Sequence, residues 1–81
     1  MVPWQADDFI IVRRTPADSL IGRRPSTFAL IGPGLAVGGI PFVTVDEATE
    51  RGRVIAQNSR VSLWDATGPG QAVLVVTFRR A

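Results

Sequence analysis

The chain has 81 residues, and none of them is histidine, cysteine, lysine or tyrosine. These four types carry most covalent and acid–base catalysis near neutral pH, whereas the nine arginines stay protonated and act as anion clamps rather than as bases. We therefore predict a protein that is not an enzyme, with no catalytic residues and no cofactor. Without cysteine there is no disulfide, and without cysteine or histidine we expect no metal site.

Size and composition predict one domain that associates with itself. A domain of this length buries only about 60–65% of the surface that its unfolded chain exposes. The chain is 46% hydrophobic and has no stabilising crosslink. Because a second copy is the simplest source of further burial, we expect a homodimer or a higher oligomer.

Charge and hydropathy bear on location and partners. The net charge of +2 is too small to predict binding to a polyanion. The first residues lack the basic region of a signal peptide, so we expect a cytoplasmic protein. The 21 residues from Pro25 to Val45 are uncharged. Three prolines and four glycines interrupt them, which predicts a strand–loop–strand segment and no contact with a membrane.

Two strands are predicted in the first third of the chain. Phe9–Arg14 opens with the β-branched run of a buried strand, and turn residues follow at Thr15–Ser19. After an irregular excursion, Thr27–Ile31 is expected to return as the antiparallel partner of the first strand.

The next segment, Gly32–Pro41, is too rich in glycine and proline to form a helix. We interpret it as a corner-forming loop with a brief strand at Phe42–Val43 after it. A phosphate-binding loop would need a lysine, which the chain lacks. A small-ligand pocket under the loop remains an alternative, with four glycines as its candidate residues: Gly32, Gly34, Gly38 and Gly39.

The clearest local signal is a capping box at Thr44 to Glu47, which predicts a helix from Val45 to about Asn58. Its inward residues are expected to be small: Ala48, Gly52, Ile55, Ala56 and Ser59. Glycine in mid-helix costs about 1 kcal/mol relative to alanine. Close approach of the helix to a sheet is a plausible compensation at Gly52.

Two more strands are predicted after the helix, at Val61–Asp65 and Ala72–Phe78, around a turn at Ala66–Gln71. The last strand is apolar on both faces, so we expect it to be central. The fold class is therefore a small α+β domain, an antiparallel sheet of four to five strands packed on one helix in the order β-β-(β)-α-β-β. This pattern is typical of many small bacterial α+β domains, and no motif identifies a family.

One helix covers one face of such a sheet, and the other face needs a cover. Our functional hypothesis is a binding or assembly module that self-associates through this second face. The expected contact residues are Trp64, Val73, Val75 and Thr77.

An alternative hypothesis is a nucleic-acid-binding module in which arginines lie beside stacking tryptophans. Three doublets are the candidates: Arg13 and Arg14, Arg23 and Arg24, and Arg79 and Arg80. They could form one patch if the first and last strands were neighbours. Solvated strand ends that discourage aggregation explain the same doublets more simply, so nucleic acid is not the favoured partner.

Overall fold

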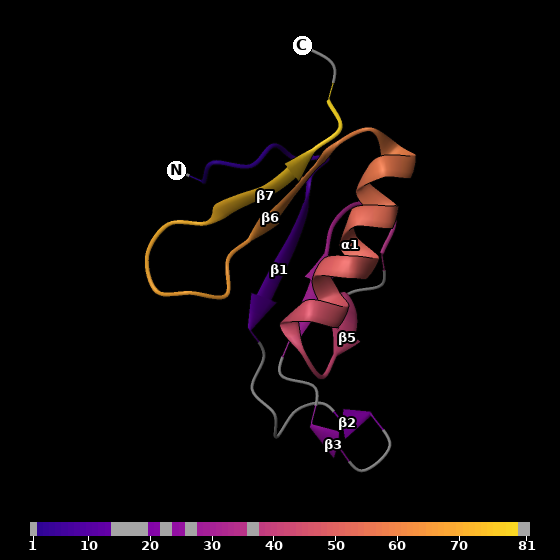
Figure 1. Cartoon of the computed structure of the whole chain (residues 1–81), viewed down its shortest axis with the longest axis vertical. Helices are drawn as coiled ribbons and strands as arrows, with labels where there is room; N and C mark the ends of the chain where they lie inside the picture. The colour runs from indigo at the N-terminus through magenta and orange to yellow at the C-terminus, as the bar shows by residue number, and fades with distance from the viewer. Residues whose placement is uncertain (1, 14–19, 22–23, 26–27, 36–37, 80–81) are drawn as a thin grey trace.

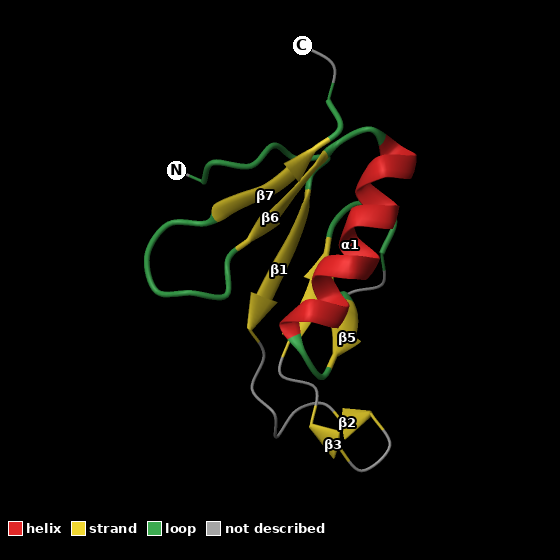
Figure 2. Ribbon diagram, viewed as in Figure 1, coloured by secondary structure: helices red, strands yellow, loops and turns green. Residues whose placement is uncertain are grey.

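A computed structural model describes residues 2–13, 20–21, 24–25, 28–35 and 38–79 of the chain. It contains one helix, α1, and a five-stranded sheet (Figures 1 and 2). The elements of this main unit are β1 (Phe9–Arg13), β4 (Phe28–Ile31), β5 (Ile40–Phe42), α1 (Val45–Ser59), β6 (Ser62–Asp65) and β7 (Val73–Thr77). Two short strands, β2 (Leu20–Ile21) and β3 (Arg24–Pro25), form a separate ladder that the sequence did not indicate. The predicted α+β class with a single helix is confirmed.

The sheet is mixed, with the strand order β5-β4-β1-β6-β7. The predicted antiparallel pairing of the first two long strands is confirmed, with Ile11 opposite Leu30. The expectation of a purely antiparallel sheet was wrong, because β6 runs parallel to β1. The reason lies in the connection: α1 carries the chain back along the sheet, so β6 starts at the same end as β1.

The last strand was expected to be central and instead lies at the edge. The central strand is β1, whose residues Phe9, Ile10 and Ile11 are all buried. Apolar residues on both faces did not distinguish β7 from β1, because an edge strand can leave apolar residues of either face exposed to solvent. Val73 and Leu74 are 65% and 45% exposed.

Helix α1 covers one face of the sheet (Figure 2), and its small residues make this contact close. Ala48, Gly52 and Ala56 are buried there. A Cβ atom at Gly52 would lie 2.7 Å from Leu63 Cδ1, so the proposed reason for this glycine is confirmed. Of the other predicted inward residues, Ile55 packs against the core as expected. Ser59 is exposed, because the helix ends there.

Both helix ends are closed by local hydrogen bonds. The Glu47 backbone N–H donates to Thr44 Oγ1 over 3.2 Å, which confirms this half of the capping box. At the other end the helix runs to Ser59, one residue beyond the predicted Asn58, and Arg60 takes the left-handed conformation with φ 55°. Its N–H donates to backbone carbonyls of the last turn, as glycine commonly does at this position.

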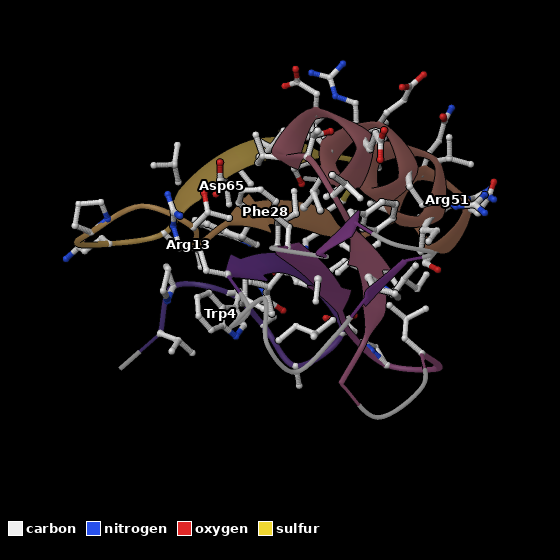
Figure 3. All side chains as sticks on the ribbon, turned by 90° about the horizontal axis from the view of Figure 1, so that it is seen from below. Trp4, Arg13, Phe28, Arg51 and Asp65 are labelled. Carbon is white, nitrogen blue, oxygen red and sulfur yellow. The ribbon has the colours of Figure 1, made fainter. Side chains whose placement is uncertain are left out.

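The second face of the sheet is partly covered by the N-terminal segment. Ile10 and Ala29 alternate with the core residues of β1 and β4, so they point away from α1, yet they are 6% and 0% exposed. Figure 3 shows Trp4 on this side of β1. The N-terminal segment was not predicted as a cover of this face. No helix within the described residues is long and apolar enough to cross a membrane.

Candidate functional site

Asp8 joins β6 and Arg79, which lies two residues beyond the end of β7, to the start of β1. Its carboxylate is 2% exposed and accepts from the Ser62 N–H over 2.9 Å and from Trp64 Nε1 over 3.1 Å. The Arg79 guanidinium donates to it from beyond the end of β7. The Gln5 N–H, from the N-terminal segment, donates over 2.9 Å. We call this group of contacts the Asp8 anchor.

Charge is balanced within the anchor. Burial raises the pKa of Asp8, but the hydrogen bonds from Gln5, Ser62, Arg79 and Trp64 outweigh burial and hold this pKa below its ordinary value. Hydrogen bonds from the guanidinium to Asp7 and Asp8 in turn raise the pKa of Arg79. A carboxylate that is ionised and occupied on both oxygens is poorly suited to act as a general base. We therefore assign Asp8 a structural role.

Trp64 lies beside the exposed part of β7. It follows Leu63, which is buried under α1, so it points to the opposite face, where the anchor holds its ring half-buried. Its cross-strand neighbour is Leu74. On the same face Thr77 lies opposite Ser62, and their hydroxyl groups are 2.8 Å apart. Trp64, Leu74 and Thr77 form what we call the β7 surface.

A β-bulge changes the faces that the sequence predicted for β7. Leu63 pairs with Val76 while the next residue, Trp64, pairs with Leu74, so one extra residue is inserted in β7. As a result Val75 packs against the core instead of facing outward with Trp64. Val73 pairs with Asp65 and so lies on the α1 side, although it is largely exposed. Of the four expected contact residues, only Trp64 and Thr77 share the second face.

The described arginines of the predicted patch lie apart. Arg13, at the end of β1, donates through Nε to the Thr67 carbonyl, and its guanidinium lies 5.7 Å from the Phe28 ring centre. Arg79 is bound at the other end of β1, because Asp8 immediately precedes that strand. The premise that the first and last strands are neighbours was wrong, since β6 separates them. The other four doublet residues give no test: Arg14, Arg23 and Arg80 lie outside the described residues, and Arg24 is placed only as backbone in β3.

The glycine loop packs directly on the sheet at two of its four candidate positions. A Cβ atom at Gly32 would lie 2.3 Å from Phe9 Cδ1, and one at Gly39 would lie 2.3 Å from the Leu30 carbonyl oxygen. Gly34 and Gly38 have φ angles of 81° and 85°, which suit a turn. Gly32 and Gly39 therefore contact the sheet directly, and Gly34 and Gly38 lie at corners of the loop.

A shallow pocket of about 260 Å³ lies between the N-terminal segment and the loop that joins β6 to β7. Its lining residues carry no charge: Val2, Pro3, Trp4, Ala66, Gly70, Gln71 and Ala72. This pocket was not predicted from the sequence. The available signal was an uncharged, tryptophan-bearing segment at the start of a chain whose sheet needs a cover on one face.

Comparison of the chain with protein-family models, curated proteins and solved structures finds no match.

Proposed function

We propose that this protein is a non-enzymatic assembly module that self-associates through the β7 surface. The observation that carries the proposal is an exposed apolar strand at the edge of the sheet: Leu74 of the β7 surface is 45% exposed, and its neighbour Val73, on the α1 side of the same strand, is 65% exposed. Edge strands of this kind are usually protected by charge, proline or a covering segment. The β7 strand contains neither charge nor proline.

The distribution of charge favours a second copy as the partner. Residues 66–78 are uncharged, and Arg79, which follows them, is paired with Asp7 and Asp8. Two copies of one chain carry the same net charge of +2, so they repel least where they meet through an uncharged surface. The β7 surface meets this condition.

Sedimentation of three proteins tests the proposal. We expect the wild-type chain to form a dimer or a larger oligomer at micromolar concentrations, and Leu74→Arg to be a folded monomer with an unchanged circular dichroism spectrum and a lower melting temperature, because it loses the stabilisation that association gives. Val54→Arg is the matched control, because Val54 is 51% exposed on α1, and it should sediment as wild type. A wild-type monomer at high micromolar concentration would overturn the proposal.

A further inference from the structure

The register of the sheet shows which backbone groups of β7 face outward. The Ala66 N–H donates to the Ile11 carbonyl over 2.9 Å, so Ala66 and, two residues earlier, Trp64 direct their backbone groups toward β1. Leu74, opposite Trp64, therefore forms a non-hydrogen-bonded pair with β6. Its N–H and carbonyl point to the open edge.

Thr77, three residues after Leu74, also directs its backbone groups to the open edge. The Ser62 N–H donates to Asp8, on the β1 side, so its partner Thr77 also turns its backbone groups outward. The Phe78 N–H donates to the Val61 carbonyl over 3.0 Å, which agrees with the alternation along β7. No backbone hydrogen bond joins another part of the described chain to this outer edge.

From this pattern we infer that two copies pair through their β7 edges as antiparallel strands around a two-fold axis at Leu74. The inference rests on the proposed function and specifies its geometry. The bulge spaces the outward groups of Leu74 and Thr77 three residues apart, where an unbulged strand has two. In the two-fold pair Leu74 faces Leu74 of the second copy, and Thr77 faces Ala72 of the second copy. The three-residue step from Leu74 to Thr77 on the bulged part of one strand therefore lies opposite the two-residue step from Leu74 to Ala72 on the other strand.

The side chains also fit this arrangement. The two Leu74 side chains meet on the face opposite α1, each beside the Trp64 ring of its own copy. The uncharged start of one β7 lies near Arg79 of the other copy, and that guanidinium is already neutralised by Asp7 and Asp8. The dimer would join two five-stranded sheets into one continuous sheet.

Single-cysteine variants test the register cleanly, because the chain has no cysteine of its own. Directly opposed residues in a hydrogen-bonded antiparallel pair have Cα atoms about 5.5 Å apart, within the range of a disulfide. Leu74→Cys should therefore give a covalent dimer on mild oxidation. Val54→Cys, equally able to react with a maleimide, should stay monomeric. Ala72→Cys and Thr77→Cys should crosslink to each other when mixed and not when oxidised separately.

The outcomes separate this inference from the proposed function. A dimer in sedimentation whose Leu74→Cys variant does not crosslink, while Trp4→Cys does, would overturn edge pairing and leave self-association through the second face. A monomer in sedimentation would overturn both. Crosslinking of Leu74→Cys, together with crosslinking between Ala72→Cys and Thr77→Cys when these are mixed, supports the register. Crosslinking of Val54→Cys at the same rate as Leu74→Cys would contradict it.

Discussion

The two halves of the sheet on either side of β1 are built differently. On one side, β4 and β5 pair in antiparallel order, Leu30 and Ala29 are fully buried, and the edge strand β5 has three residues with Pro41 in the middle. On the other side, β6 is parallel to β1, the buried charge of Asp8 fastens it, and the edge strand β7 has five uncharged residues. Only the first half carries a proline at its edge.

This difference indicates how a domain without crosslinks can combine stability with an open surface. The proline of β5 lacks an N–H and discourages a further strand. The β7 edge is left without such a residue, and the Asp8 anchor fixes the strands beside it. The half that would form the interface therefore combines apolar packing through Val61 and Leu63 with the buried charge of Asp8, whereas apolar packing holds the described residues of the other half.

The largest expected effect tests that contrast directly. Asp8→Ala would leave the Ser62 N–H and Trp64 Nε1 without their acceptor, while Arg79 would keep its pairing with Asp7. We expect a loss of about 2–3 kcal/mol in the free energy of unfolding. Hydrogen exchange should show lost protection in β6 and β7 and retained protection in β4. Equal loss in both halves would contradict the contrast. Asp7→Ala is the control: Asp7 is 59% exposed, so its removal should change stability little.

A smaller effect is expected where α1 contacts both halves. A Cβ atom at Gly52 would press on Leu63 of β6 and lie 3.3 Å from Leu30 Cδ1 of β4. Leu63 is fully buried and has little room to move, so overpacking should exceed the gain in helix propensity. We expect Gly52→Ala to cost about 1 kcal/mol in urea denaturation, with loss in both halves. Gly68→Ala, which has open space around it, should be neutral.

The smallest effect is expected from pH. The chain has no histidine, so thermal stability should stay nearly constant between about pH 6 and pH 10. Because the pKa of Asp8 is lowered on folding, its stabilising contribution is complete above the unfolded pKa, near 3.9, and is lost as the pH falls through the folded value. Melting temperatures of wild type and Asp8→Asn should therefore converge in acid. A parallel decline of the two would contradict this role for Asp8.

Much of the secondary structure was predictable because its signals are local. The Thr44 to Glu47 capping box placed the start of α1, and the mid-helix Gly52 indicated a close contact with the sheet. The alternation of side chains along a strand placed Trp64 on the opposite face of the sheet from Leu63. The pairing of the first two long strands followed from their lengths and spacing. The candidate site was only half predicted, because Trp64 and Thr77 face the expected side and Val75 does not.

The sequence by itself determined the residue types available for chemistry, the helix with its N-terminal cap, and the positions of the main strands. Tertiary structure alone decided that β6 lies parallel to β1, that β7 is an edge, and that a bulge turns Val75 to the core. The physical reason is that strand order and register depend on contacts between residues far apart in the chain. Asp8 shows this most clearly, because its acidic side chain gives no sign of the partners that folding brings from residues 62, 64 and 79.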